Sequence, residues 1–237
     1  MAFGRIPRFS PSFSPSEAWI CTKHLLGIGG SDPLVPQFEQ EFASFIGAKH
    51  GIMVPSARYG LYLLLDALGV GEGDEVILPG LTYFAIPAMV ELLGAKPVFA
   101  DIGLETHVLD PESFRGAITE KTKAVIPTHL FGTPCDMDAI NAIAKEHNIE
   151  VIEDCAQSTG ARYRGKRVGA IGGHAYYTFG LTKNITTLSG AMVTTDDDAV
   201  AEKIRAVINQ SGPAVRSKAI KEAATGVAMF LATHPWI

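Results

Sequence analysis

Short apolar runs alternate with amphipathic stretches along most of this 237-residue chain. The first firm helix is predicted over about 33–46, because Phe38, Phe42 and Ile46 form an apolar stripe at helical spacing and Gly47 can end the helix. A strand–helix alternation follows this helix. The runs predicted as strands lie near 51–54, 75–78, 97–100, 124–127 and 151–153, and the helical patterns lie near 57–68, 83–93, 111–118, 137–147 and 197–208.

The predicted strands are continuously apolar, with little alternation between hydrophobic and polar positions. Such strands are typical of a sheet that helices cover on both faces. The pattern therefore predicts an α/β fold with a mostly parallel sheet flanked by helices. Between Tyr176 and Thr195 strand-like pieces follow one another without a helix, so this stretch can add an antiparallel strand.

Both ends of the chain differ from this alternating pattern. Residues 1–30 are rich in Pro, Ser and Gly and are predicted to form an extended arm, without the continuous apolar core of a signal peptide. The run at 223–232, AATGVAMFLA, is apolar but too short to span a bilayer. We expect it to form a buried or subunit-facing helix rather than a membrane anchor.

Composition narrows the class of protein further. With 47% hydrophobic and 19% charged residues, the chain can fill a globular core. The net charge of −5 and the absence of a basic block argue against nucleic acid as the main ligand. Cys21, Cys135 and Cys155 stand in unrelated contexts, which favours neither a disulfide framework nor a metal site and predicts a cytoplasmic protein.

Chemically interesting residues follow several predicted strands, and ligands of open α/β sheets bind beyond the carboxyl ends of the strands. Asp154 ends the run VIED, where its carboxylate can pair with a protonated pyridine nitrogen or simply cap a turn. Lys183 lies in the run TFGLTKN and can form an imine with an aldehyde cofactor, then act as a general base. Alternatively, Lys183 is an ordinary solvent-exposed lysine, but its apolar neighbours argue against this interpretation.

Two further strand ends offer a phosphate site and an aromatic face. Ser56 precedes a helix predicted from about Ala57, so the amides of Ala57 and Arg58 can bind a phosphate at the helix N-terminus. Ser56 is equally well explained as an ordinary N-cap. Tyr83 follows another strand and can stack on a planar ring or belong to the core.

Over about 33–212 the chain resembles the DegT-type sugar-nucleotide aminotransferases, which have the fold of type I pyridoxal-phosphate enzymes. The similar pieces occur in the same order as in the family and include FEQEFASFIGAKHGI, GVGEGDEVILPGLTY, LLGAKPVFADI, ITEKTKAVIPTHLFG, DMDAINAIAKEHNIEVIEDCAQSTGARYRGKRVG, TKN and EKIRAVINQSG. The resemblance implies that 31–212 is the pyridoxal-phosphate-binding large domain.

The resemblance also implies a role for each matching residue. Lys183 corresponds to the lysine that binds pyridoxal 5′-phosphate, and Asp154 corresponds to the carboxylate that pairs with the pyridine nitrogen. Gln157 corresponds to a glutamine close to the phenolic oxygen of the cofactor, and Tyr83 to the stacking aromatic residue. Thr178 replaces a serine that usually binds the cofactor phosphate.

Ser56 and the amides that follow it correspond to the phosphate-binding start of a helix. The family commonly has Gly-Thr after this serine, whereas this chain has Ala57 and Arg58, which removes one hydroxyl and adds a guanidinium. The loop 188–191 reads Leu-Ser-Gly-Ala where the family usually has Gly-Glu-Gly-Gly, so substrate choice can differ. Family members continue into a smaller C-terminal domain. Residues 213–237 are therefore predicted to be a helical segment leading toward a small domain that this chain lacks, and we expect a fragment of a longer protein.

The resemblance implies transamination from an amino acid, expected to be glutamate, to a keto sugar nucleotide, in a homodimer with shared active sites. Two alternatives stay open: another pyridoxal-phosphate reaction on the same fold, such as dehydration, and a non-catalytic fragment or regulatory homologue. Retention of Lys183 favours aminotransfer over dehydration. A nicotinamide-binding domain is disfavoured because no G-x-G-x-x-G motif follows the first strand.

Overall fold

A seven-stranded sheet forms the centre of the protein in the computed structural model, which describes residues 14–26, 28, 34–211 and 216–233. The strand order is β1-β9-β8-β5-β4-β2-β3. The strands of the sheet are β1 (His50–Val54), β2 (Glu75–Pro79), β3 (Lys96–Ala100), β4 (Thr122–Val125), β5 (Glu150–Asp154), β8 (Gly173–Thr178) and β9 (Ala191–Thr195), and β6 (Arg162–Tyr163) pairs with β7 (Lys166–Arg167) in a separate ribbon.

The pairing pattern confirms the predicted fold class. The five strands from β3 to β8 in the sheet order are parallel to one another. Strand β9 runs antiparallel to both β8 and β1, so the segment between Tyr176 and Thr195 does add an antiparallel strand. Because β1 is reached through two antiparallel pairings, it runs in the same direction as β8.

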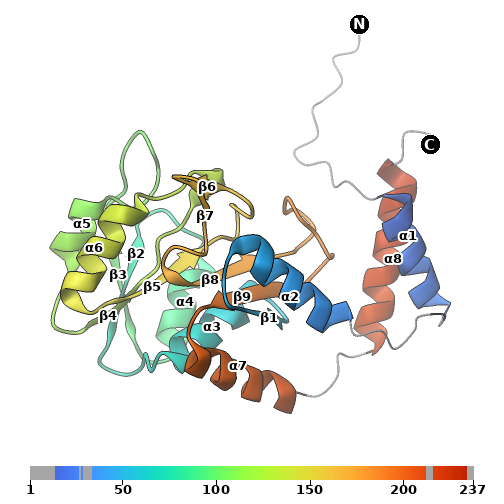
Figure 1. Ribbon diagram of the computed structural model, residues 1–237, viewed down its shortest axis with the longest axis horizontal. Helices are drawn as coiled ribbons and strands as arrows, with labels where there is room; N and C mark the ends of the chain where they lie inside the picture. Colours follow the sequence, from blue (N-terminus) through green and yellow to red (C-terminus); the bar gives the residue numbers. More distant parts are fainter. Residues whose placement is uncertain (1–13, 27, 29–33, 212–215, 234–237) are drawn as a thin grey trace, which may run out of the picture.

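Helices cover both faces of the sheet (Figure 1). The helices are α1 (Pro15–Leu25), α2 (Leu34–Ile46), α3 (Ala57–Ala67), α4 (Ala85–Leu92), α5 (Pro111–Ala117), α6 (Met137–His147), α7 (Asp198–Gln210) and α8 (Arg216–Thr233), with a short 3-10 turn at Leu130–Gly132. Successive residues of a strand point to opposite faces. Accordingly, Val76 packs in the core beneath α3, α4 and α7, whereas its neighbour Ile77 packs in the core beneath α5 and α6.

Helix α2 covers the part of the sheet around β8 and β9. The predicted stripe is confirmed, since Phe42 and Ile46 are buried there and Phe38 packs against them. The Phe42 ring meets the rings of Tyr177 and Phe179 edge to face, with centroids 4.9 and 5.4 Å apart. Aromatic pairs of this geometry add to the stability gained from burial alone.

The prediction that residues 1–30 form an extended arm is wrong for 15–25, which form helix α1. A capping box begins this helix: the Ser14 Oγ accepts from the Glu17 N–H at 3.3 Å, and the Glu17 carboxylate accepts from the Ser14 N–H at 2.6 Å. Pro15 occupies the first helical position, where proline is tolerated because its missing N–H would have no helical acceptor. Residues 1–13 lie outside the described residues.

Helix α1 packs side by side with α8, beside the sheet domain (Figure 1). The expected C-terminal helix is therefore present, and it extends over Arg216–Thr233. Within the described ranges, none of the helices combines the length and apolarity needed to cross a bilayer.

Candidate active site

The carboxyl ends of the parallel strands meet at one edge of the sheet, and a cavity of about 350 Å³ lies there. All eight residues predicted from the sequence line it: Ser56, Ala57, Arg58, Tyr83, Asp154, Gln157, Thr178 and Lys183. Cavities that bind small molecules in proteins usually have volumes of about 300–1,000 Å³. A larger but more open depression of about 670 Å³, bounded by Leu104 and Arg164 among others, shares no residue with this cavity. We favour the smaller cavity because the strand ends converge on it.

Sheet topology explains why these residues meet. Asp154 ends β5 and Thr178 ends β8, and these two strands are parallel neighbours. Ser56 follows β1, whose direction matches that of β8, so its turn lies at the same edge. Strand β9 runs in the opposite direction and begins at this edge, which brings the preceding loop with Lys183 into the cavity wall.

Ser56 begins helix α3 and caps it. Its backbone is extended, with φ −161° and ψ 157°, and its Oγ accepts from the Tyr59 N–H at 3.3 Å. The capping interpretation is therefore correct, and it does not exclude a phosphate site. Ala57 and Arg58 occupy the first turn, where backbone N–H groups have no helical acceptor and the helix dipole favours anions. Among the described residues Arg58 makes no ion pair, and its side chain borders the cavity.

Asp154 and Lys183 influence each other across the cavity. Asp154 is only 3% exposed, and its Oδ1 accepts from the Ala156 N–H at 2.9 Å. Burial raises the pKa of Asp154, while the Ala156 amide, the nearby Tyr176 hydroxyl and the charge of Lys183 act in the opposite direction. Burial lowers the pKa of Lys183, and the charge of Asp154 opposes this shift. The site thus pairs an amine whose lowered pKa favours loss of its proton with a carboxylate whose ionised form is stabilised by a cationic partner.

The other predicted residues complete the walls. Tyr83 is 51% exposed, which excludes the interpretation that it belongs to the core, and its ring centroid lies 4.5 Å from that of Phe84. Gln157 is exposed, and its Oε1 accepts from the Phe131 N–H at 3.3 Å. The Thr178 Oγ1 accepts from the Gly180 N–H at 3.4 Å. Each of these side chains keeps a surface that a ligand can contact.

Five residues that line the cavity were not singled out from the sequence: Ile86, Thr128, Ala156, Tyr176 and Thr182. Thr128 follows β4, so the rule that ligands bind beyond strand ends could have found it. Its Oγ1 lies 3.1 Å from the Oγ1 of Thr82. Tyr176 lies within β8, inside a continuous apolar run, and nothing in that pattern indicates that its hydroxyl faces a cavity.

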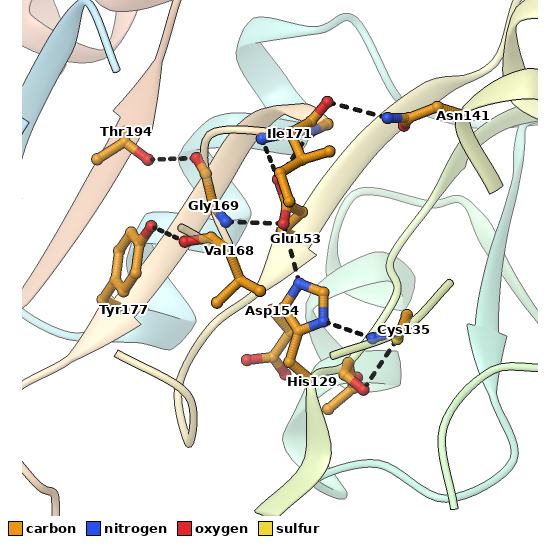
Figure 2. A network of polar contacts seen from close by, with 12 residues as sticks. His129, Cys135, Asn141, Glu153, Asp154, Val168, Gly169, Ile171, Tyr177 and Thr194 are labelled. Atoms are coloured by element: carbon orange, nitrogen blue, oxygen red, sulfur yellow. Dashed lines mark hydrogen bonds and ion pairs between the residues drawn. The ribbon is translucent and has the colours of Figure 1, made fainter. Parts of the chain in front are cut away.

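A buried hydrogen-bond network lies directly behind Asp154 (Figure 2). The Glu153 carboxylate is fully buried and accepts four hydrogen bonds, from the backbone N–H groups of Gly169, Ile171 and Gly172 and from the His129 ring. The His129 Nδ1 accepts from the Cys135 N–H at 3.0 Å, so the ring proton is on Nε2, which donates to Glu153 at 2.9 Å. This pair is therefore a neutral imidazole bound to a carboxylate.

The same geometry argues against a metal ion at this place. His129, Glu153 and Cys155 offer ligand atoms within 4.8 Å of one another. However, the Glu153 oxygens and the His129 Nδ1 already accept N–H groups, and the Nε2 carries a proton.

The backbone N–H of His129 also donates to the Asp154 carbonyl oxygen at 3.1 Å. The network thus fixes the backbone on either side of the cavity.

Similar proteins include aminotransferases and enzymes named after sugar nucleotides. The chain is 45% identical to the GDP-perosamine synthase of Caulobacter vibrioides over 176 aligned residues, with 74% of this chain and 47% of the synthase covered. An aminotransferase from Psychrobacter cryohalolentis is similar in structure, with a TM-score of 0.79, 41% identity, and coverage of 84% of this chain and 52% of the other. A GDP-4-keto-6-deoxymannose-3-dehydratase, solved with a trapped PLP-glutamate geminal diamine, has a TM-score of 0.78 and 28% identity, covering 84% and 53%.

The similar proteins are all longer than the part of them that this chain matches. The chain spans 44% to 47% of the length of the curated relatives that it matches. The sheet and the helices that flank it have the fold of the type I pyridoxal-phosphate transferases. Residues 27–232 match the DegT/DnrJ/EryC1/StrS aminotransferase family, and the chain belongs to this family.

Proposed function

We propose that this chain carries the cofactor-binding part of a pyridoxal-phosphate-dependent aminotransferase that acts on a keto sugar nucleotide. The observation that carries the proposal is the convergence of Lys183, Asp154 and the N-terminus of α3 on one cavity. An amine, a carboxylate and an anion site are the three groups that a phosphorylated pyridine aldehyde requires. The names of the similar proteins supply the sugar-nucleotide class.

The residues of the cavity fit pyridoxal 5′-phosphate. Asp154 would hold the pyridine nitrogen, and Lys183 would bind the aldehyde carbon. The first-turn amides of α3, with Arg58 and Thr178, would hold the phosphate, because N–H groups, a guanidinium and a hydroxyl all donate to its oxygens. When bound, the cofactor supplies an electron sink for the pair of electrons released at the substrate α-carbon.

Each protein group has a stated task in this proposal. Lys183 would act as the general base, its Nζ holding the proton that leaves the α-carbon of the amino donor and returning it as the reaction proceeds. The lowered pKa of Lys183 favours this work, since a general base must be unprotonated. Asp154 would keep its negative charge against the ring N–H of the cofactor, and Tyr83 would cover the face of that ring. Gln157 would donate from its amide nitrogen toward the phenolic oxygen of the cofactor.

Substrates and subunit organisation are part of the same proposal. Glutamate is the expected amino donor, and the similar dehydratase was solved with a glutamate adduct of the cofactor. We propose a homodimer with shared sites, because large apolar side chains lie exposed beside the cavity. Phe84 is 76% exposed and is in contact with Tyr83, and Phe131 is 77% exposed and binds Gln157 through its N–H. Exposed apolar surface of this kind marks contact sites.

A second candidate function is dehydration, because one similar structure is a dehydratase. The retained Lys183 favours aminotransfer, since dehydratase variants of this fold replace the lysine. The two functions can be separated by the fate of the amino group. Aminotransfer converts glutamate to its keto acid and leaves the nitrogen on the sugar, whereas dehydration leaves no nitrogen on the product.

The first experiment tests whether Lys183 binds the cofactor. The full chain is mixed with pyridoxal phosphate, its visible absorbance is recorded, and borohydride reduction followed by peptide mass spectrometry locates the attached mass. We expect attachment at Lys183 and loss of the visible band in Lys183→Ala. Lys166→Ala, at an exposed lysine on β7, is the matched control and should retain the band. An unchanged band in Lys183→Ala would remove Lys183 from the proposed role.

Adding glutamate tests turnover. Loss of the visible band with release of the keto acid supports aminotransfer. A band that does not respond to glutamate favours the alternative that this length of chain binds the cofactor without turnover.

A further inference from the structure

The hydroxyl of Tyr176 is buried, borders the cavity, and has no hydrogen-bond partner among the described residues. The residue is only 1% exposed. Buried polar groups in proteins are nearly always hydrogen-bonded, because leaving water without a new partner costs free energy. An unpartnered hydroxyl in a cavity wall therefore indicates an interaction that is completed when the cavity is filled.

Tyr176 is placed beside Asp154 by the sheet itself. The two residues are register partners across the parallel pair β5–β8, and both side chains border the same cavity. The Asp154 Oδ1 accepts from Ala156, and within the described part of the chain no hydrogen bond reaches its Oδ2. The carboxylate thus has unused capacity to accept, and the nearest strand carries an unused donor.

The two groups already interact through their charges. Burial raises the pKa of Tyr176 well above its usual value, and the charge of Asp154 and a hydrogen-bonding interaction with its carboxylate act in the same direction, so the hydroxyl keeps its proton and can only donate to a carboxylate. The two side chains are therefore close enough to shift each other's pKa, but their contact falls short of hydrogen-bond geometry, since no group among the described residues meets that geometry at the Tyr176 oxygen.

We propose that Tyr176 is a positioning residue, whose hydroxyl donates to the Asp154 carboxylate when a cationic pyridine ring occupies the cavity. This inference rests on the proposed function. A second donor stabilises the ionised form of the carboxylate, so Asp154 competes less strongly for the proton of the ring nitrogen. The proton therefore stays on the ring, which keeps the ring an effective electron sink.

The test is Tyr176→Phe in the full chain, which removes one oxygen atom and keeps the aromatic ring. Pyridoxal phosphate is titrated into both proteins, and the visible band is recorded across pH. We expect the variant to bind the cofactor about tenfold more weakly, in line with the loss of one hydrogen bond to a charged group. We also expect the pH dependence of the band to shift, because proton sharing between the ring and Asp154 changes.

The stability of the cofactor-free proteins distinguishes a positioning tyrosine from one that only supports the fold, because loss of a structural hydroxyl would lower the free energy of unfolding. Tyr176→Phe should be as stable to urea as the parent or more so, because it removes a buried hydroxyl without a partner. Tyr177→Phe is the matched control on the opposite face of β8, where the hydroxyl donates to the Val168 carbonyl at 3.0 Å. The control should lose stability and keep the affinity and the spectrum of the parent.

Two results would overturn the inference alone: a Tyr176→Phe spectrum and affinity equal to those of the parent, or a clear loss of stability in the cofactor-free variant. Failure of the parent itself to bind pyridoxal phosphate would overturn the proposed function, and this inference with it.

Discussion

Replacing Glu153 by Gln tests the buried network behind Asp154 with the smallest possible change in shape. The amide oxygen of the glutamine can still accept the N–H groups of Ile171 and Gly172, which now bind Oε1 at 2.8 and 2.6 Å. The amide nitrogen then takes the place of Oε2. It would face the N–H of Gly169 and the Nε2–H of His129, which are donors at 2.7 and 2.9 Å.

The imidazole cannot relieve this conflict by moving its proton. If His129 carried its proton on Nδ1, its Nε2 could accept from the new amide, but Nδ1–H would then face the Cys135 N–H. One donor–donor contact would disappear and another would form. Reversing the amide of the glutamine moves the conflict to Ile171 and Gly172 without removing it.

The expected magnitude follows from the groups left without a partner. Two buried donors at about 1–3 kcal/mol each give about 2–6 kcal/mol. The bonds that survive also weaken, because hydrogen bonds to an ionised acceptor are roughly twice as strong as neutral ones. We expect a loss of about 3–6 kcal/mol in the free energy of unfolding, a large part of the about 5–15 kcal/mol of a typical protein.

Urea unfolding, followed by circular dichroism, measures this loss. The matched control is Glu91→Gln on an exposed turn of α4, where we expect a change within about 0.5 kcal/mol. The transition midpoint of Glu153→Gln should fall while its slope stays constant. A loss below about 1 kcal/mol would refute the reasoning, since it would mean that Glu153 is already uncharged or that the network rearranges freely.

Two further predictions concern the loop behind the network and the pH dependence of cofactor binding. Gly169→Ala should lower the free energy of unfolding by about 2–5 kcal/mol, because a Cβ at φ +91° would overlap the Tyr177 hydroxyl. In the control Gly165→Ala, at φ +86°, the new Cβ meets no atom, so the loss measured by urea unfolding should be only about 1–2 kcal/mol. Equal losses in the two variants would contradict the overlap. Covalent attachment of pyridoxal phosphate should reach its maximum rate at a lower pH than a free lysine requires, because burial lowers the pKa of Lys183. Asp154→Asn should shift this rate profile to still lower pH in stopped-flow absorbance, since it removes the charge that favours the protonated amine, and a shift to higher pH would exclude the assigned coupling.

Local patterns in the sequence determined most of the elements and the edge of the sheet at which the site lies. Short runs rich in apolar residues identified β1, β2, β3, β4 and β5, because strands of a sheet covered by helices bury most of their side chains. Strand β3, at the edge of the sheet, is the least buried of the five. The strand-end rule then selected Asp154 and Ser56 without knowledge of strand order, since all parallel strands end at the same edge. Lys183 needed more, because a single lysine in a loop acquires meaning only from its resemblance to a family motif.

Composition misled the prediction for the N-terminal segment. Pro, Ser and Gly are frequent in extended arms, and this average hid the capping box of Ser14 and Glu17. A helix start depends on particular residues at fixed spacing rather than on the overall composition. Careful attention to the pattern S-P-S-E would have predicted α1.

Only the tertiary structure could decide which buried groups face one another. The apolar run of β8 indicates that Tyr176 and Tyr177 are buried. The pairing of β8 with β5 decides that Tyr176 lies beside Asp154 at the cavity, whereas the Tyr177 hydroxyl donates to the Val168 carbonyl. Likewise, the sequence shows Glu153 only as a charged residue within a strand. The fold brings its hydrogen-bond partners Gly169 and His129, which are distant in the sequence, next to it. The physical reason is that periodicity records how much of a side chain is buried, whereas strand order and register, set by contacts between distant segments, determine its neighbours.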